Sequence, residues 1–305
     1  WVRRTVKRYD EVVGVASLAD HSSRPQRSPA KTPTEIATAI CALKHAHPAW
    51  GRRQIAKQLR WQWRTDPVRQ QWVSVGRVRR VLAQHPELAA PAPASLARMP
   101  PRQIDYLACN LLWAADFHET HLSDGSVWYT LHWLDLYSRF ELGQLTTQHM
   151  TEELVVQSFL AVAQQYGLPQ IVKTDHDKLW YDGVSGLPSY LTRVLCALGV
   201  YHLLVGPKQP WWNGVVERYV RTCRQEVVLP PPEASAAVPQ AIETARQFYN
   251  ETRCHSQCHD QPPATLYQPS LRRVPPAFDP RQAPFTQEPL LLSRPLPARG
   301  CIPPA

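Results

Sequence analysis

The chain has 305 residues, 44% of them hydrophobic, so it is long enough for two domains and can build at least one sizeable core. No run of 18 apolar residues occurs, which excludes a membrane-spanning helix, and seven cysteines at irregular spacings do not indicate a disulfide framework. The net charge of +9 is unevenly divided: residues 1–104 carry 19 Lys or Arg against 6 Asp or Glu, and residues 105–305 carry 15 against 19. Phosphates need cations and hard metal ions need carboxylates, so the division favours a nucleic-acid-binding part followed by a metal-dependent part. A solubilising charge bias is the alternative explanation.

Residues 1–30 begin with a basic helical pattern and end in a segment of Ser, Arg and Pro. We expect a truncated helical element followed by a linker. Residue 1 is Trp and no charged-then-apolar leader follows, which suggests a fragment of a longer intracellular protein rather than a secreted one.

Residues 31–88 contain three helical patterns with apolar residues on one face and bases on the other. Thr32, Pro33 and Glu35 are typical of the start of the first helix, with Thr32 as the N-cap. The second helix covers AWGRRQIAKQLR, and Ser74 is expected to cap the third, SVGRVRRVLAQH. Three short helices with exposed bases are typical of a helix-turn-helix DNA-binding domain. The candidate DNA contacts are Arg52, Arg53, Lys57, Arg77, Arg79 and Arg80.

The connection between the second and third helices, RWQWRTDPVRQQWV, is far longer than the turn of the standard motif. We expect a hairpin or extended loop whose Trp61, Trp63 and Trp72 pack against the helices, and base stacking or wedging is the alternative role. Residues 89–107 are rich in Pro and Ala and predict a semi-rigid linker between two domains.

Beyond the linker, short apolar runs replace the helical spacing. LLWAADF, VWYTLHWLD and RFELGQLTT, separated by turn residues, predict three antiparallel strands. A helix from an N-cap at Thr151 to a stop at Gly167 is expected next. The strand PQIVKTD, the helix SYLTRVLCALG, the strand YHLLV and the loop and helix PKQPWWNGVVERYVRTCRQE follow. Strands first and alternating units later predict a mixed α/β sheet flanked by helices.

Three acids carry the candidate chemistry. Asp116 is expected to close the first strand and Asp175 the fourth, which would bring both carboxylates to one rim of the sheet, and Glu217 lies on a helix packed across it. Three such carboxylates can hold a pair of hard divalent ions for a phosphodiester displacement. Each acid alone has a simpler interpretation, because a strand-end Asp can cap a turn and Glu217 stands among arginines that could form surface ion pairs.

Several pieces of the chain, spanning roughly Leu18 to Tyr267, resemble bacterial insertion-sequence transposases with a retroviral-integrase-type DDE core. These pieces are LADHSSRPQRSP, HPAWGRRQIAKQL, WAADFHE, YTLHWLDLYSRFELG, TDHD, LGVYHLLVGPKQPWWNGVVERYVRT and FYNETRCHSQCHDQPPATLY. The resemblance implies an RNase H-like core at residues 108–268, two Mg²⁺ or Mn²⁺ ions, and DNA cleavage with strand transfer. The catalytic and metal-binding triad would be Asp116, Asp175 and Glu217.

The same resemblance implies DNA contacts around the loop and helix of the third acid, at Lys208, Asn213, Arg218 and Arg221. Family members act as multimers on paired DNA ends. A homo-oligomer bound to double-stranded transposon ends and target DNA is therefore expected, with accessory transposition proteins as further partners and the bacterial cytoplasm as its location.

The chain departs from the family pattern after Asp175. A small or Gly-containing pair is usual there, whereas this chain has His176 and Asp177 and an apparent insertion, LWYDGVSGLPS. Asp177 could compete for a metal or lie in solvent. His176 could contact the substrate phosphate or be an ordinary loop histidine. Trp211 and Trp212, immediately before Asn213, could stack on a base or pack the loop down. Asp135, at the end of the second strand, is expected to face the same region in a structural, hydrogen-bonding role.

Two further stretches have simpler interpretations. Cys254, His255, Cys258 and His259 are too close in sequence to close a tetrahedral zinc site alone, and we expect them to be structural. Residues 269–305 predict a Pro-rich tail that wraps a neighbour or begins a further module.

Two other function classes stay open. One is a hydrolytic nuclease of the same fold, which cleaves without joining. The other is a DNA-binding or targeting protein that keeps the fold without the activity. The basic helical domain argues against the first, and the intact trio of acids argues against the second.

Overall fold

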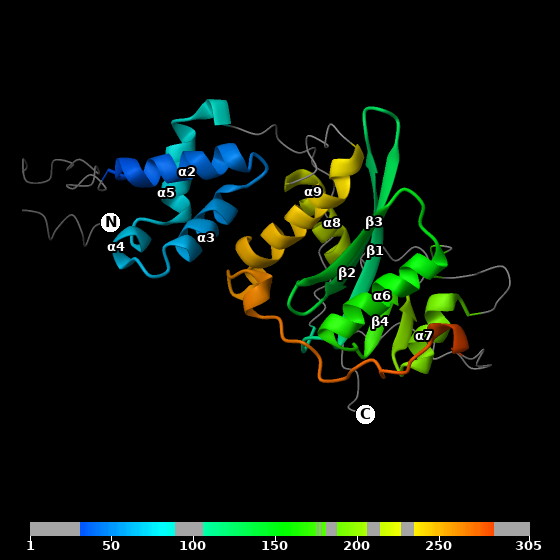
Figure 1. Cartoon of the computed structure of the whole chain (residues 1–305). Helices are drawn as coiled ribbons and strands as arrows, with labels where there is room; N and C mark the ends of the chain where they lie inside the picture. Colours follow the sequence, from blue (N-terminus) through cyan, green and yellow to red (C-terminus); the bar gives the residue numbers. More distant parts are fainter. Residues whose placement is uncertain are drawn as a thin grey trace, which may run out of the picture.

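The computed structural model describes residues 31–88, 106–175, 177, 179–180, 188–205, 214–226 and 235–283. They form a helical unit at residues 31–88 and a five-stranded sheet with helices on both faces (Figure 1). No helix within these ranges is long and apolar enough to cross a membrane. The predicted N-terminal element at residues 1–30, most of the linker, and residues 284–305 of the tail lie outside the described residues.

The helical unit contains the three predicted helices. They are α2 (Thr34–Ala46), α3 (Arg52–Gln62) and α5 (Val75–Ala83). Ser74 caps α5 as expected, since its side chain accepts a hydrogen bond from the Arg77 amide. One face of each helix is buried in a common apolar cluster that includes Ile36, Ile40, Ile55, Leu59, Val78 and Val81.

Two details of this unit were predicted wrongly. Pro33 is the N-cap of α2 in place of Thr32, and no side chain caps this helix. The segment between α3 and α5 is not a hairpin but contains the short helix α4 (Pro67–Gln70). Asp66 caps α4 by accepting a hydrogen bond from the Arg69 amide, and a proline at the first position favours a helix.

The sheet has the order β3-β2-β1-β4-β5. Its strands are β1 (Leu112–His121), β2 (Val127–Asp135), β3 (Glu141–Thr147), β4 (Ile171–Thr174) and β5 (Tyr201–Leu204). The first three strands form the predicted antiparallel meander, whereas β4 runs parallel to β1 and β5 parallel to β4. This mixed sheet confirms the expected α/β class and its RNase H-like arrangement.

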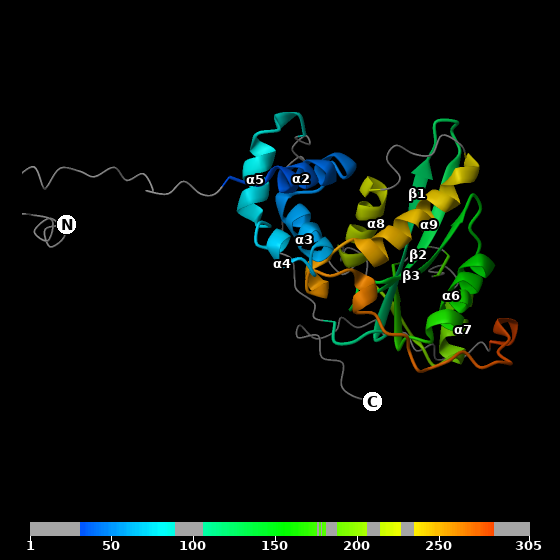
Figure 2. The ribbon, with the colours of Figure 1, turned by 60° about the vertical axis from the view of Figure 1, so that its left-hand side comes forward.

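Successive side chains along the strands belong alternately to two apolar clusters, one on each face of the sheet. Trp113 and Trp133 pack against α6 (Glu152–Tyr166) and α7 (Tyr190–Ala197) on one face. Ala114 and Leu134 pack on the other face against α8 (Gly214–Glu226), beside which α9 (Val238–Gln247) runs (Figures 1 and 2). The position of a residue along a strand therefore decides which helices its side chain meets.

The caps of α6 agree with the sequence. Thr151 accepts a hydrogen bond from the Leu154 amide, and Gly167 ends the helix with φ 83°. Residues after 268 then pack back on α6: the Ser270 amide donates to the Tyr166 carbonyl at 2.7 Å, and the Leu168 amide donates to the Arg272 carbonyl at 2.8 Å. The expectation of a tail that wraps a neighbour is therefore wrong for residues 271–283, which cover their own core.

The helical unit docks on the segment that follows α9. Gln54 Nε2 donates to the Cys254 carbonyl at 2.9 Å, and Gln58 Nε2 donates to the Thr252 carbonyl at 2.9 Å. Lys57 Nζ lies 2.9 Å from Asp260 Oδ1. Both views accordingly place the helical unit on the α8 and α9 side of the sheet (Figures 1 and 2).

Candidate active site

Asp116 lies in the middle of β1, opposite His132 of β2, so the prediction that it closes the strand was wrong. The strand continues beyond Asp116 because the polar residues that follow are buried in the sheet and are not exposed in a loop. His118 and Thr120 are buried, at 5% relative exposure each. A polar inner face thus replaces an apolar one in the second half of this strand.

The three candidate acids come from three elements on one face of the sheet. Ala114 packs against α8, so the alternation along β1 directs Asp116 to the same side. Asp175 directly follows β4, as expected, and Glu217 is an exposed residue of α8 next to the buried Val216. Strand alternation and helix packing together bring the acids to one region.

Their charges interact. Burial, and then the negative charges of Asp175 and Glu217, raise the pKa of Asp116 to about 7, although a hydrogen bond from the Phe117 amide acts in the opposite direction. Lys173 is buried on β4, and its burial, together with the charge of Arg139, lowers its pKa to about 8 against the opposing effect of Asp116 and Glu217. The described part of this region therefore combines three interacting carboxylates with the buried ammonium group of Lys173.

Asp175 is held by the segment that follows it. Its Oδ1 accepts hydrogen bonds from Trp180 Nε1 at 2.7 Å and from the Asp177 amide at 3.1 Å. The Trp180 ring is stacked on Phe117 of β1, with 4.2 Å between centroids. Trp180, which belongs to the apparent insertion in the sequence, therefore anchors one candidate acid to the strand that carries another.

Asp177 is exposed, and its Oδ1 accepts a hydrogen bond from the Leu179 amide at 2.9 Å. A cavity of about 900 Å³ opens between Asp177, β1 and α8, and its lining includes Phe117, His118, Val220 and Arg224. The cavity begins next to Asp116 in sequence, since Phe117 and His118 line it, but Asp116, Asp175 and Glu217 are not among its lining residues.

Carboxylates are suitable ligands for a divalent cation, but the three acids do not form a preformed metal-binding site. Within the described residues, no three His, Cys, Asp or Glu side chains form a group that could already hold a metal ion. Carboxylates that raise the pKa of a neighbour are repelling one another, and a cation of high charge removes that repulsion. Asp116 and Asp175 would hold such an ion from the sheet, and Glu217 would complete its ligands from α8.

The predicted DNA contacts have different surroundings. Arg52, Arg53, Arg79, Arg80, Arg218 and Arg221 are exposed. The Arg77 guanidinium lies 4.2 Å from the centre of the Trp72 ring, and Lys57 is paired with Asp260. The remaining predicted site residues, His176, Lys208, Trp211, Trp212 and Asn213, lie outside the described residues.

Asp135 has the expected hydrogen-bonding role but not the expected place. Its side chain accepts bonds from the Asn110 amide at 2.7 Å, the Ser138 amide at 2.8 Å and Ser138 Oγ at 2.6 Å. It lies opposite Trp113, three residues and about 10 Å along the strand from the position of Asp116. Asp135 therefore orders the turn after β2 and does not face the other acids.

The Cys and His stretch is built into the core. Cys254 and Cys258 are buried at 0% and 2% relative exposure. The Cys258 thiol donates to the Ser138 carbonyl at 3.0 Å, and the His255 ring packs edge-on against Tyr249. These contacts agree with the structural role expected from the sequence.

The raised pKa of Asp116 predicts how the metal-free protein responds to pH. The folded state binds this proton up to about pH 7, whereas the unfolded carboxyl releases it near its ordinary value of 3.8. The free energy of unfolding therefore falls as pH rises through this window. Asp116→Asn removes the penalty, which for a pKa raised from 3.8 to about 7 is on the order of 4 kcal/mol at pH 8, so in EDTA the variant should melt roughly 8–16 °C above wild type at pH 8, with a smaller difference at pH 5. Adding Mn²⁺ at pH 8 should reverse the order, and a pH-independent difference would contradict the assignment.

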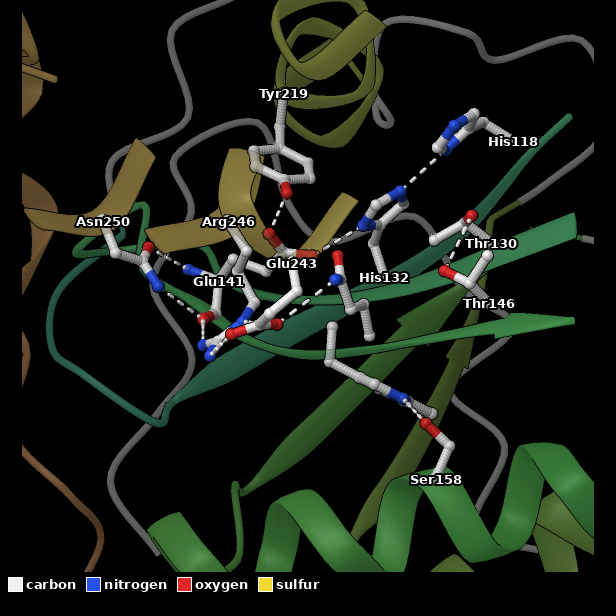
Figure 3. Close-up of polar contacts among 12 residues, drawn as sticks. His118, Thr130, His132, Glu141, Thr146, Ser158, Tyr219, Glu243, Arg246 and Asn250 are labelled. Carbon is white, nitrogen blue, oxygen red and sulfur yellow. Dashed lines mark hydrogen bonds and ion pairs between the residues drawn. The ribbon is translucent and has the colours of Figure 1, made fainter. Parts of the chain in front are cut away.

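Sequence reasoning missed one buried group of polar side chains on this face. His118, His132, Glu141 and Tyr219 form a hydrogen-bonded chain that runs from β1 across β2 and β3 to α8 (Figure 3). The signal was present as polar residues with a spacing of two inside strands, in HET of β1 and TLH of β2.

Residues 198–263 match the sequence family described as "Integrase core domain". This segment contains Glu217, and the expected resemblance to integrase-core proteins is confirmed over it. Similar solved structures include a simian T-cell lymphotropic virus intasome in complex with the PP2A regulatory subunit B56 gamma. The two sequences are 18% identical, the alignment covers 67% of this chain and 71% of that chain, and the TM-score is 0.48. The HTLV-2 integrase catalytic core domain in complex with magnesium, in its trimeric form, is 15% identical over 53% of this chain and 99% of that chain, with a TM-score of 0.43. The BIV integrase catalytic core domain is 18% identical over 52% and 93%, with a TM-score of 0.40.

Proposed function

We propose that the chain is a polynucleotidyl transferase of the transposase and integrase type, which binds the ends of a DNA element, cleaves them and joins them to target DNA. The observation that carries the proposal is the meeting of Asp116, Asp175 and Glu217 on one face of the sheet, where burial, and then the charges of the other two acids, raise the pKa of Asp116. The match of residues 198–263 to the integrase core domain supports it.

The roles follow from position and charge. Two Mg²⁺ or Mn²⁺ ions held by the three carboxylates would activate the attacking hydroxyl and stabilise the leaving oxygen. Asp116 and Asp175 would supply ligands from the sheet, and Glu217 would supply one from α8. Water attacks first and frees a 3′-hydroxyl, which then attacks a phosphodiester of the target strand, so that one diester bond replaces another.

The DNA-binding role falls to cations on two parts of the chain. In residues 31–88, proposed as the helix-turn-helix domain, the exposed Arg52, Arg53, Arg79 and Arg80 suit phosphate contacts. On α8 and in the sequence just before it, Arg218, Arg221, Lys208 and Asn213 are proposed to contact the substrate strand. Lys57 and Arg77 join this interface only if DNA displaces Asp260 and Trp72 from them. A homo-oligomer on paired DNA ends and accessory transposition proteins are part of the same proposal.

The test is a strand-transfer assay. The full chain is incubated with labelled DNA carrying the ends of its own element, a target plasmid, and either Mg²⁺ or EDTA. We expect nicked ends and joined products in Mg²⁺ and neither in EDTA. Cleavage without joining would favour a hydrolytic nuclease, and end binding without either product in Mg²⁺ or Mn²⁺ would favour an inactive DNA-binding protein.

A further inference from the structure

A chain of buried polar side chains links the strand of one candidate acid to the helix of another (Figure 3). His118 Nδ1 lies 2.7 Å from His132 Nε2, and His132 Nδ1 lies 2.6 Å from Glu141 Oε1. The Tyr219 hydroxyl of α8 donates to Glu141 Oε2. At the other end, Thr120 Oγ1 lies 3.2 Å from His118 Nε2. We name this set the β1–α8 relay.

Burial fixes the protons of the relay. His132 and Glu141 are fully buried, and burial lowers the pKa of His132 to about 3 while it raises the pKa of Glu141 well above its usual value. The pair is therefore neutral, with the proton on the carboxyl group. Glu141 donates to His132 Nδ1, which leaves His132 Nε2–H to donate to His118 and His118 Nε2–H to donate to Thr120. Each bond in the relay sets the direction of the next.

The central residue of the relay is held by its backbone as well. Asn250, which follows α9, accepts from the Glu141 amide at 2.9 Å and donates to the Glu141 carbonyl at 2.8 Å. Arg246 of α9 adds a bond from Nη1 to the same carbonyl at 3.5 Å. Glu141 is thus a fixed point on β3, and a bond to its side chain locates whatever group makes it.

Two members of the relay lie close to the candidate acids in sequence. His118 is two residues beyond Asp116 and, by strand alternation, on the same face. Tyr219 is two residues beyond Glu217 on α8. Val216, which is also buried on this helix, makes apolar contacts, which are non-directional and tolerate small rotations. A hydrogen bond from Tyr219 to a fixed acceptor is directional and limits rotation of α8 about its axis.

We propose that the β1–α8 relay is a positioning device that sets the rotation of α8, and with it the direction of Glu217, against the strand that carries Asp116. The inference rests on the proposed function for its catalytic consequence, whereas the mechanical link between α8 and the sheet is independent of it. Buried polar networks of this kind specify one arrangement of elements where apolar packing alone permits several.

Removal of one hydroxyl group tests the link. Tyr219→Phe keeps the aromatic ring against Tyr249 and His132 and removes only the bond to Glu141. The matched control is Tyr267→Phe, which removes a hydroxyl that donates to Asn110 Oδ1 at 2.9 Å away from α8. In protein without metal or DNA, we expect amide hydrogen exchange at residues 214–226 to become at least tenfold faster in Tyr219→Phe and to be unchanged in the control.

The same pair separates positioning from general weakening of the fold. In the strand-transfer assay we expect Tyr219→Phe to lower kcat at least tenfold with KM for the DNA end within twofold of wild type. Tyr267→Phe should leave both within twofold, even if the two variants lose similar amounts of Tm. Equal exchange at residues 214–226 and equal kcat in the two variants would overturn the proposal.

Substitution at the central residue supplies a rescue. Gln has the same donor and acceptor as a protonated Glu, so Glu141→Gln should retain kcat within threefold, with unchanged imidazole ¹⁵N shifts for His118 and His132. Glu141→Met has similar size but neither group, and should match Tyr219→Phe in exchange and in kcat. If Glu141→Gln is as impaired as Glu141→Met, the relay is not the positioning device. If the wild type has no activity on DNA, the proposed function fails, while the exchange experiment still decides whether the relay fixes α8.

Discussion

Replacing Glu217 with Gln is expected to lower the rates of DNA cleavage and joining by about 10³-fold or more. Several kcal/mol of transition-state stabilisation depend on correctly held metal ions, and each 1.36 kcal/mol corresponds to a factor of ten in rate. Gln keeps the size of the side chain but offers a neutral amide in place of a charged ligand. Because Glu217 is exposed on α8, the fold should be unaffected. Rates from single-turnover assays with labelled DNA ends, and Tm in EDTA, provide the measurements.

The control for this variant is Glu153→Gln. Glu153 is also an exposed helical residue, but it lies in the first turn of α6 on the opposite face of the sheet. Its replacement should leave both rates within twofold of wild type. Normal rates for Glu217→Gln, or equal losses in the two variants, would show that Glu217 is a surface residue among arginines and not a metal ligand.

The strands of the core were predictable because successive apolar side chains point alternately into two apolar clusters, one on each face of the sheet. Trp113 and Ala115 alternate with Leu112 and Ala114, and the two sets meet different helices. A stretch with this pattern is stable only as a strand with both faces covered. For the same reason the mixed α/β class and the succession of strands and helices along the chain could be predicted without the structure.

The end of β1 was not predictable in this way, because its inner face changes from apolar to polar. His118 and Thr120 look like loop residues when each is judged by its own hydropathy. They are strand residues because partners far apart in the chain satisfy their hydrogen bonds: His132 on the next strand and, through it, Glu141. Long-range polar pairing of this kind leaves only a period of two in the sequence as its sign.

The surroundings of Asp175 were missed for a similar reason. The stretch after it departs from the family pattern and was treated as an insertion, yet Trp180 is fully buried, stacks on Phe117 and donates to Asp175. A Trp that belongs to an irregular segment has no periodicity to place it. Only the packed sheet supplies the cavity that it fills and the carboxylate that its indole N–H reaches.

Gly167→Ala is expected to be among the most destabilising single substitutions in the core. Gly167 ends α6 with φ +83°, and a Cβ added there would lie 2.5 Å from the Ser270 carbonyl oxygen and 2.6 Å from that of Arg272. Both neighbours are backbone atoms that α6 and the following turn hold in place, through Ser270 to Tyr166 and Leu168 to Arg272. The methyl group can therefore be accommodated only by moving residues 270–272 away from the end of α6.

A comparison with Gly125 separates the backbone strain of the Gly167→Ala substitution from its steric overlap with neighbouring atoms. It has the same φ of +83°, but an added Cβ would meet nothing within 4 Å. Gly125→Ala should therefore lose about 1 kcal/mol of unfolding free energy from backbone strain alone. Gly167→Ala should lose about 3 kcal/mol or more, since it adds overpacking against fixed carbonyl groups to the same strain. Urea unfolding of the two variants beside wild type measures the difference. Equal losses would mean that residues 270–272 yield freely, and that this segment contributes little to holding α6 on the sheet.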